Sequence, residues 1–179
     1  MPLDPAVPSC PADFCMNSMH EQAREPTENR VACGDEAAVG RLAAAVAGGL
    51  PPQAVVTLQG DLGAGKTTFV KHLAAAIGID PATVTSPTFG LIHLHQPPTR
   101  GEPHRLVHVD AYRLAGEEEL EELGWEELLA DGGWIIVEWP QRIAAALPPR
   151  RLEIAIAVSG PTSRVVTLRP LGGMRPVGL

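Results

Sequence analysis

Residues 60–67 read GDLGAGKT and satisfy the spacing G-x-x-x-x-G-K-[S/T] of a phosphate-binding loop. The short apolar run 54–59 precedes this loop, and a helical pattern from about Lys66 to Ile77, closed by Gly78, follows it. In such a strand–loop–helix unit the glycines let successive backbone N–H groups curve around phosphate oxygens, and the helix N-terminus adds a partial positive charge. The sequence therefore predicts that the chain binds a nucleoside triphosphate on a P-loop α/β domain.

The loop and the first helical turn supply the predicted nucleotide contacts. The Lys66 ammonium is placed to reach the β- and γ-phosphates, and the Thr67 hydroxyl is placed to ligate Mg²⁺. The predicted cofactors are therefore ATP and Mg²⁺. The residues of this segment that we assign to nucleotide binding are Asp61, Leu62, Gly63, Ala64, Gly65, Lys66, Thr67 and Thr68.

Strand and helix patterns alternate along the middle of the chain. Asp35 is a predicted N-cap, and the helix after it ends at Gly48-Gly49. Strands separated by helices predict one α/β domain with a mixed, mostly parallel sheet flanked by helices. Further strands are predicted at 89–95, 105–110, 134–138, 152–158 and 164–169, the last two as a hairpin, and further helices at 117–130 and 140–146.

The two ends of the chain lack this alternation. Residues 1–30 hold five prolines and no sustained periodicity, so we expect a disordered, dispensable extension. The P-loop domain is then expected at 31–170, followed by a flexible tail at 171–179. No apolar stretch approaches the ~20 residues that span a bilayer, which excludes a membrane-spanning chain and predicts no membrane contact.

The three cysteines do not form a recognisable metal or disulfide pattern. Cys10, Cys15 and Cys33 could be combined with His20 into a zinc set, but the spacing fits no common zinc finger. No secretory segment precedes them. We therefore interpret them as reduced thiols, which predicts a cytoplasmic protein.

Two carboxylates end apolar strands. Glu138 follows the run 134–137, and Asp110 follows the run 105–109. Doubly wound sheets bind ligands at the carboxyl ends of their strands. One acid is thus predicted to complete the Mg²⁺ shell and the other to orient the attacking water, and Glu138 ends the better apolar run.

Ser86-Pro87-Thr88 lies between the P-loop helix and the next strand. A hydroxyl at this place can sense the γ-phosphate in the manner of a switch loop. The alternative is a plain turn set by Pro87. Both interpretations stay open from the sequence.

Charge is unevenly distributed. The chain has 14 basic and 21 acidic side chains, and nine of the acids fall between Arg113 and Arg142, where there is no base. This acidic segment is either a solvated helix face or a docking surface for a basic partner. No basic stripe with interleaved aromatic residues occurs, which excludes a general nucleic-acid-binding surface. The four histidines between His93 and His108 lack the spacing of a metal site.

Five segments taken together resemble the TsaE (YjeE) family, the ATPase component of bacterial threonylcarbamoyl-adenosine tRNA modification. A P-loop alone occurs in many families, whereas its combination with an H-x-D-x-Y-R box and a Glu-Trp pair is highly specific. The resemblance runs from about Val31 to Leu152 and more loosely to Arg169. The segments are GDLGAGKTT at 60–68, SPTF at 86–89, HVDAYRL at 108–114, EELEELGWEELL at 118–129 and VEWP at 137–140.

The resemblance implies an activity and a set of partners. It implies a compact P-loop domain that hydrolyses ATP weakly by itself and supports TsaD-like and TsaB-like threonylcarbamoyl-transferase subunits. These would modify the adenosine beside the anticodon in tRNAs that read codons beginning with A. Contact with tRNA would be indirect, through the complex.

The resemblance also implies roles for individual residues. Lys66 and the loop amides would hold the phosphates, while Thr67 and Glu138 would hold Mg²⁺. Asp110 would lie close to the γ-phosphate. The predicted catalytic residues are Lys66, Asp110 and Thr88; Asp35 and Glu36 would lie near the base, Glu36 being counted among the nucleotide contacts, and Trp139 beside the metal-binding acid.

Two other functions remain compatible with the P-loop. A small-molecule or nucleotide kinase is the first, because Arg142, Arg150 and Arg151 could clamp a second phosphate. A nucleotide-dependent binding module with negligible turnover is the second. A kinase would phosphorylate a defined acceptor by itself, and a binding module would hydrolyse nothing even in a complex.

Overall fold

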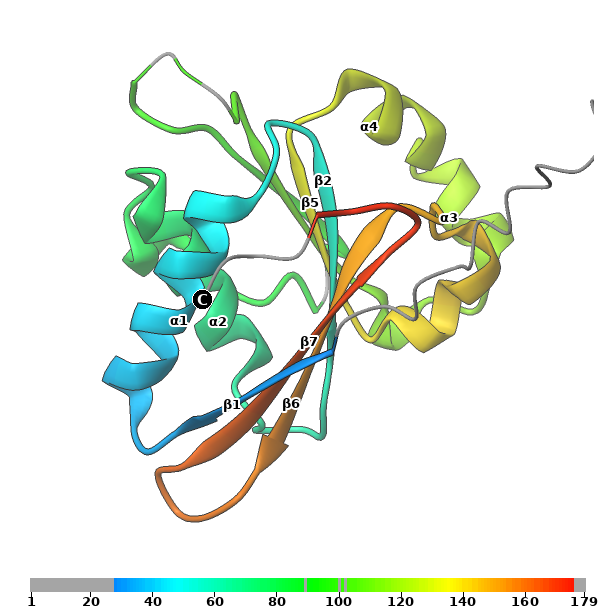
Figure 1. Cartoon of the computed structure of the whole chain (residues 1–179). Helices are drawn as coiled ribbons and strands as arrows, with labels where there is room; N and C mark the ends of the chain where they lie inside the picture. The colour runs from blue at the N-terminus through cyan, green and yellow to red at the C-terminus, as the bar shows by residue number, and fades with distance from the viewer. Residues whose placement is uncertain (1–27, 89, 100, 102, 176–179) are drawn as a thin grey trace, which may run out of the picture.

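The computed structural model describes residues 28–88, 90–99, 101 and 103–175, and Figure 1 shows them as one sheet between two helical layers. The sheet has seven strands in the order β1-β7-β6-β2-β5-β4-β3. The strands are β1 Asn29–Cys33, β2 Ala54–Gln59, β3 Ile92–His95, β4 Leu106–Asp110, β5 Trp134–Glu138, β6 Arg151–Val158 and β7 Arg164–Leu171.

The centre of the sheet is parallel. Strands β6, β2, β5 and β4 run in the same direction, while β7, β1 and β3 add antiparallel pairs at the two sides. Glu138 of β5 lies opposite Leu58 of β2 on one side and opposite Asp110 of β4 on the other. The carboxyl ends of these three strands therefore meet at one edge of the sheet, beside the loop that follows β2.

Helices cover both faces of the parallel centre. On one face lie α1 (Glu36–Gly49) and α2 (Lys66–Ala76); on the other lie α3 (Glu117–Glu122), α4 (Trp125–Asp131) and the 3-10 segment η3 (Pro140–Ala146), as Figure 1 shows. This arrangement confirms the predicted single α/β domain with a mixed sheet flanked by helices. Two further 3-10 segments, η1 (Pro81–Thr83) and η2 (Ala111–Arg113), follow α2 and β4.

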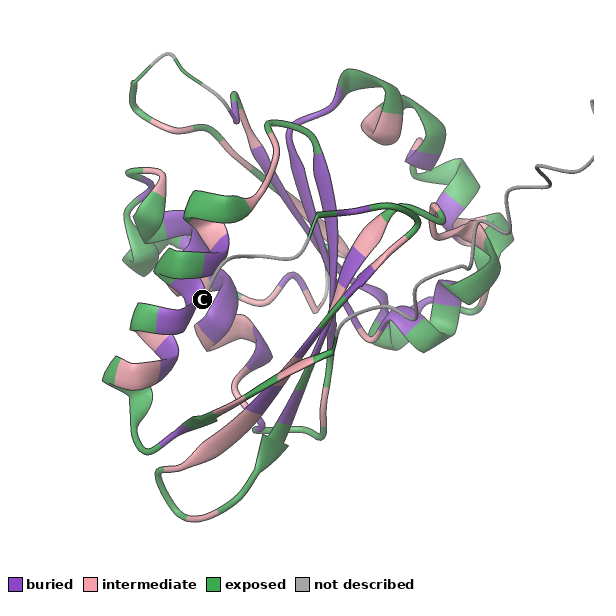
Figure 2. Cartoon of the chain, in the orientation of Figure 1, coloured by how far each residue is buried: buried purple, intermediate pink, exposed green. Residues whose placement is uncertain are grey.

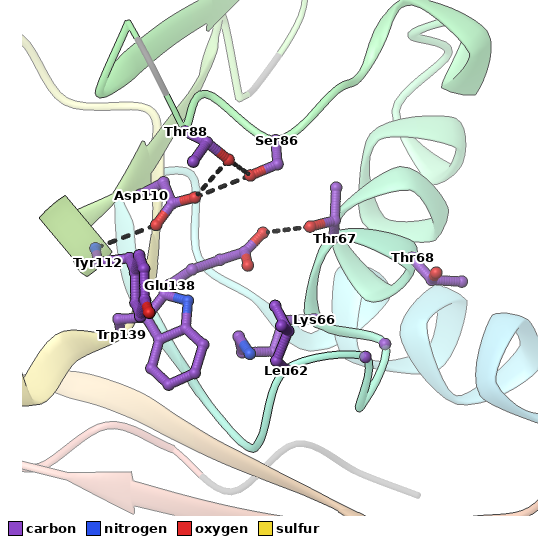
Figure 3. Close-up of a pocket in the computed structure, with 12 residues that line it drawn as sticks. Leu62, Lys66, Thr67, Thr68, Ser86, Thr88, Asp110, Tyr112, Glu138 and Trp139 are labelled. Atoms are coloured by element: carbon purple, nitrogen blue, oxygen red, sulfur yellow. Dashed lines mark hydrogen bonds between the residues drawn. The ribbon is translucent and has the colours of Figure 1, made fainter.

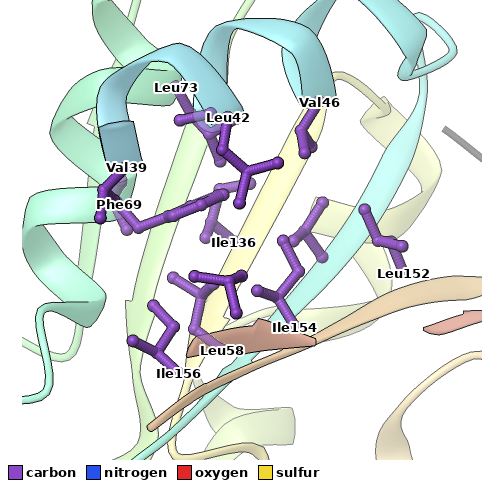
Figure 4. Close-up of a cluster of buried hydrophobic side chains, with 14 of the residues drawn as sticks. Val39, Leu42, Val46, Leu58, Phe69, Leu73, Ile136, Leu152, Ile154 and Ile156 are labelled. Carbon is purple, nitrogen blue, oxygen red and sulfur yellow. The ribbon is translucent and has the colours of Figure 1, made fainter. Parts of the chain in front are cut away.

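The core has two parts, one on each face of the sheet. Trp134 and Ile136 of β5 pack in the cluster beneath α1 and α2, while Ile135 and Val137 pack in the cluster beneath α3, α4 and η3. Burial on both faces is typical of a central parallel strand and explains why β5 reads as a continuous apolar run. Figure 2 shows this burial along the central strands, and Figure 4 shows side chains of the first cluster.

The structure differs from the predicted boundaries at three places. Strand β1 was not predicted. Only Cys33 among its five residues is fully buried, and Arg30 and Ala32 are exposed. The predicted acidic helix is two helices, since Gly124 takes a left-handed φ of 78° that ends α3. Strand β3 begins only at Ile92, after Leu91 with a φ of 60°.

The predicted terminal segments lie mostly outside the described residues. This applies to residues 1–27, with Cys10, Cys15 and His20, and to residues 176–179. Strand β1 begins at Asn29, before the predicted domain start at 31. Strand β7 continues to Leu171 and the Met174 side chain is buried, so the described part of the predicted tail packs on the domain.

No helix in the described part of the chain is long and apolar enough to cross a membrane.

The structure predicts where N-terminal truncation becomes damaging. A chain that starts at Gly34 should be less stable than one that starts at Glu28, because it lacks β1, whose Val31 and Cys33 pack on the core. Fully burying such a side chain stabilises by roughly 1.5–3 kcal/mol, so a loss of several kcal/mol is expected. Urea unfolding of the two chains measures it. Equal unfolding midpoints would contradict a structural role for β1.

Candidate functional site

The loop between β2 and α2 has the backbone that its glycines permit. Gly60, Gly63 and Gly65 have φ values of 150°, 77° and 105°. At Gly60 a Cβ atom would stand 2.5 Å from the carbonyl oxygen of Ile156, so a side chain has no room there. Gly65 precedes α2 in the left-handed region, which turns the first amides of the helix toward the loop.

A cavity of about 400 Å³ opens beside this loop, at the edge where β2, β5 and β4 end. Figure 3 shows side chains around it from the loop and helix that follow β2 and from the ends of β4 and β5. The cavity brings together nine of the predicted site residues. They are Leu62, Gly63, Gly65, Lys66, Thr67, Thr68, Thr88, Asp110 and Glu138, and Ser86, Tyr112 and Trp139 complete the lining.

Lys66 is held at the base of the cavity. Its Nζ atom donates hydrogen bonds to the carbonyl oxygens of Gly60 at 2.8 Å and Asp61 at 2.9 Å. The same atom lies 3.8 Å from the ring centre of Trp139, a cation–π contact. Burial lowers the pKa of the Lys66 ammonium, and the neighbouring carboxylates, Glu138 first, act in the opposite direction. The cavity thus holds a cation that is largely withdrawn from solvent.

Thr67 and Glu138 meet across the cavity. The Thr67 hydroxyl donates to Glu138 Oε1 at 2.8 Å, and the Nε2 atom of His108 lies 2.9 Å from the same oxygen. A hydroxyl and a carboxylate in contact are the oxygen ligands that Mg²⁺ prefers. These two oxygen ligands therefore fit a magnesium ion that is also bound by nucleotide phosphates.

Asp110 accepts hydrogen bonds from two hydroxyls of the segment after α2. Its Oδ2 atom accepts from Ser86 at 2.8 Å and from Thr88 at 3.2 Å, and these two hydroxyls lie 2.8 Å apart. Its Oδ1 atom accepts the backbone N–H of Tyr112 at 3.0 Å. Ser86 and Thr88 are thus tied to a cavity carboxylate 22 to 24 residues away, which favours the switch-loop interpretation over a plain turn.

An abrupt turn after β5 brings an aromatic ring into the site. Trp139 has a left-handed backbone, with φ 59° and ψ 47°, between Glu138 and Pro140. This conformation is uncommon for a residue other than glycine. It places the indole over Lys66 and 5.0 Å from the ring of Tyr112.

A second cavity of about 280 Å³ adjoins the loop on the side of α1. Gly65 and Thr68 line both cavities, and Glu36, Ala64 and Arg164 line only the second. The Arg164 Nε atom donates to the carbonyl oxygen of Ala64 at 2.8 Å, which ties β7 to the P-loop. Apart from Asp61, the predicted contacts therefore line two adjoining cavities, one at the strand ends and one beside the start of α1.

Some residues do not match their predicted place, and others were missed. Asp61 lines neither cavity, and its contribution is the carbonyl oxygen that accepts from Lys66. His108, Tyr112 and Arg164 belong to the site but were not assigned to it. His108 could have been found, because it stands two residues before Asp110 on a strand and so shares its face.

The described histidines of β3 and β4 contact one another or Glu138. His93 and His95 of β3 stack edge to face with their ring centres 6.2 Å apart. Burial lowers the pKa of His95, and His108 and His93 act in the same direction. Among the described residues no group of three or more His, Cys, Asp or Glu side chains could hold a metal ion.

Two of the three arginines considered as a phosphate clamp, Arg150 and Arg151, are badly placed for it. Arg151 begins β6, and the register of this parallel strand puts it at the start of β2 rather than at its P-loop end. Arg151 is also bonded to Glu153 and to the carbonyl oxygen of Pro148. Arg150 precedes it at the same far edge of the sheet.

Two acids of the segment 117–131 cap local backbone. Glu119 Oε2 accepts the N–H of Ala115 at 2.9 Å, and Glu117 Oε1 accepts the N–H of Ala145 at 3.1 Å. These two have structural partners, whereas Glu118 and Glu122 are exposed. Both interpretations of the acidic segment remain compatible with this surface.

Comparison with known proteins gives a consistent result. Residues 33–166 match the family model described as "Threonylcarbamoyl adenosine biosynthesis protein TsaE". The tRNA threonylcarbamoyladenosine biosynthesis protein TsaE of Bacillus subtilis is 41% identical over 135 residues, which cover 75% of this chain and 79% of that protein. The protein of the same name from Treponema pallidum is 39% identical over 114 residues, covering 64% of this chain and 80% of that protein.

A solved structure shares the fold. The crystal structure of YdiB from Bacillus subtilis superposes with a TM-score of 0.67 at 31% sequence identity. The alignment covers 84% of this chain and 90% of that one.

Proposed function

Since the chain belongs to the TsaE family of threonylcarbamoyl adenosine biosynthesis proteins, we propose that it binds ATP with Mg²⁺ beside its P-loop and hydrolyses it slowly in support of that tRNA modification. The observation that carries this proposal is the meeting of Lys66, Thr67, Glu138 and Asp110 in one cavity, although they come from the start of α2 and from the ends of β5 and β4. Such a set supports phosphoryl chemistry on a nucleotide, which proceeds mainly by positioning and electrostatic stabilisation.

The phosphates are proposed to occupy the cavity next to the loop amides. Lys66 would then exchange the carbonyl oxygens of Gly60 and Asp61 for phosphate oxygens, which accept more strongly because they are charged. The base side of the nucleotide is assigned to the second cavity, beside Glu36. Both placements use cavities that residues of the loop help to line.

The two acids, Glu138 and Asp110, are proposed to have different roles. Thr67 and Glu138 hold Mg²⁺, which, when bound, neutralises charge on the β- and γ-phosphate oxygens. Asp110 orients the attacking water from the neighbouring strand end, and Ser86 and Thr88 hold its carboxylate in place. Thr88 would thereby couple the segment after α2 to the reacting phosphate.

Slow turnover by the isolated chain follows from what lines the cavity. Lys66 is the sole cation among the lining residues that the structure describes, and no arginine joins it. An arginine supplied by a partner can raise P-loop turnover by roughly 10³–10⁵-fold. We propose TsaD-like and TsaB-like transferase subunits as these partners, with tRNA reached only through them, in the cytoplasm.

The role in tRNA modification is tested in cells that lack this chain. Threonylcarbamoyl-adenosine should disappear from tRNA hydrolysates while other modified nucleosides stay, and expression of the parent chain should restore it. Retention of the nucleoside in the depleted cells would refute the proposal. Phosphorylation of a small acceptor by the purified chain would instead favour a kinase.

The Glu138→Gln variant should raise the Mg²⁺ concentration needed for half-maximal ATP hydrolysis by roughly tenfold while leaving the fold intact. The amide is nearly isosteric with the carboxylate but brings no negative charge to the ion. Hydrolysis measured across a magnesium titration checks this. A larger magnesium effect in Asp110→Asn would mean that the roles of the two acids must be exchanged.

A further inference from the structure

His108 is a buried polar residue at the site with no role in the function proposed above. It lies on β4 with no solvent exposure, two residues before Asp110. Val107 and Val109 pack in the cluster under α3 and α4, so the alternation along the strand turns His108 toward the face of α2. The residue is therefore directed at the ligand-binding side of the sheet rather than at the opposite core.

One hydrogen bond defines how the imidazole is used. Nε2 lies 2.9 Å from Glu138 Oε1, and a carboxylate oxygen only accepts, so the hydrogen of this bond sits on Nε2. Nδ1 is buried without a hydrogen-bond partner among the described residues. Leaving a buried ring nitrogen unpartnered costs free energy. The contact with Glu138 is thus the one hydrogen bond that the imidazole makes among the described residues.

The bond falls on the oxygen that also contacts Thr67. Glu138 Oε1 accepts from the Thr67 hydroxyl at 2.8 Å and from His108, so two donors from different elements hold one carboxylate oxygen. Rotation of the carboxylate would break both bonds. Hydrogen bonds of this kind behind a metal ligand fix its orientation, and losing one typically weakens metal binding by roughly 10–100-fold.

Resting on the ATP–Mg²⁺ site proposed above, we propose that His108 is a positioning residue for Glu138. Its Nε2–H holds the Glu138 carboxylate against the Thr67 hydroxyl, in the arrangement that receives the metal ion. His108 touches neither metal nor nucleotide in this role. It therefore contributes to metal affinity and leaves metal-free nucleotide binding unchanged.

Three substitutions at position 108 separate positioning from packing. His108→Leu replaces the imidazole with an apolar side chain of similar bulk and so removes the donor. His108→Gln places an amide N–H close to the position of Nε2 and should retain the bond, whereas the shorter His108→Asn cannot reach Glu138. His95→Leu is the matched control, because His95 is a neighbouring histidine whose buried Nε2 has no partner among the described residues.

The measurement is metal binding itself. Mn²⁺ affinity is determined by electron paramagnetic resonance in the presence of a non-hydrolysable ATP analogue, and affinity for the analogue is determined separately in EDTA. The Leu and Asn variants should bind Mn²⁺ roughly 10-fold or more weakly than the parent, with the EDTA affinity unchanged. The Gln variant and the His95→Leu control should match the parent. If the Leu variant does not fold, the Mn²⁺ affinities of the Asn and Gln variants are compared instead.

The outcomes distinguish this inference from the function beneath it. Parent-like Mn²⁺ affinity in both the Leu and Asn variants would overturn the positioning role and leave the proposed function standing. Equal losses in the Gln and Leu variants would also overturn it, since the donor would then be irrelevant. A parent chain that binds no ATP analogue, with or without metal, would refute both.

Discussion

The Lys66→Ala variant is expected to bind ATP roughly 10- to 100-fold more weakly than the parent and to lose measurable turnover. The ammonium is the sole described cation that lines the cavity, and a hydrogen bond to a charged group contributes about 1.5–3 kcal/mol. Titration calorimetry with an ATP analogue measures the affinity, and phosphate release measures the turnover.

Lys71 offers a matched control for this loss. It is the only other lysine of the chain, it lies on the same helix, and it lines neither cavity. Lys71→Ala should bind and hydrolyse ATP as the parent does. Equal effects of the two substitutions, or parent-like ATP binding by Lys66→Ala, would remove the basis for a phosphate site at this loop.

The Asp110→Asn variant should lower the rate of ATP hydrolysis by roughly 100-fold or more while changing ATP affinity little. An amide cannot take a proton from water, and a positioned base contributes about 10²–10⁴-fold to rate. It also cannot accept from both hydroxyls and the Tyr112 amide with its single oxygen. Single-turnover hydrolysis at saturating ATP checks the rate.

Asp131 serves as the comparison for Asp110. It pairs with Arg105 at 3.1 Å on the surface, at the edge of the sheet away from the P-loop. Asp131→Asn removes a carboxylate hydrogen bond of similar length and should leave hydrolysis unchanged. A single-turnover rate for Asp110→Asn within twofold of the parent would show that the water is oriented by another group.

The sequence predicts the central strands β2, β5 and β4 well because each of them is buried on both faces. A run such as Trp134–Val137 then has no polar alternation, and a single apolar stretch is visible. Strand β1 gives no such signal. It lies at the edge of the sheet with alternate residues exposed, and only its pairing with β7, more than 130 residues later, makes it a strand.

The site could be predicted as a set of residues but not as a geometry. The spacing of the P-loop fixes Lys66 and Thr67 locally, because loop and helix are continuous in sequence. The contact of Glu138 with Thr67, by contrast, depends on β5 lying beside β2, and a sequence pattern does not give strand order. The contact of His108 with Glu138 likewise depends on β4 lying beside β5, although the spacing of His108 to Asp110 is visible in the sequence.

Arg164 shows a further limit of sequence reasoning. It lies 100 residues beyond Ala64, whose carbonyl oxygen it holds at 2.8 Å, and an isolated arginine in a β-hairpin carries no pattern. Only the pairing of β6 with β2 and of β7 with β6 brings the hairpin to the loop.

The turn at Trp139 has a practical consequence. Of the three tryptophans, Trp125 and Trp134 are buried and donate their indole N–H groups to the carbonyl oxygens of Ala146 and Pro51. Trp139 alone lines the cavity, with the Lys66 ammonium over its ring. A phosphate that draws this ammonium away changes the surroundings of one indole and not of the other two. The chain therefore carries a built-in fluorophore at its ligand site, and its emission would report nucleotide arrival in real time without a label.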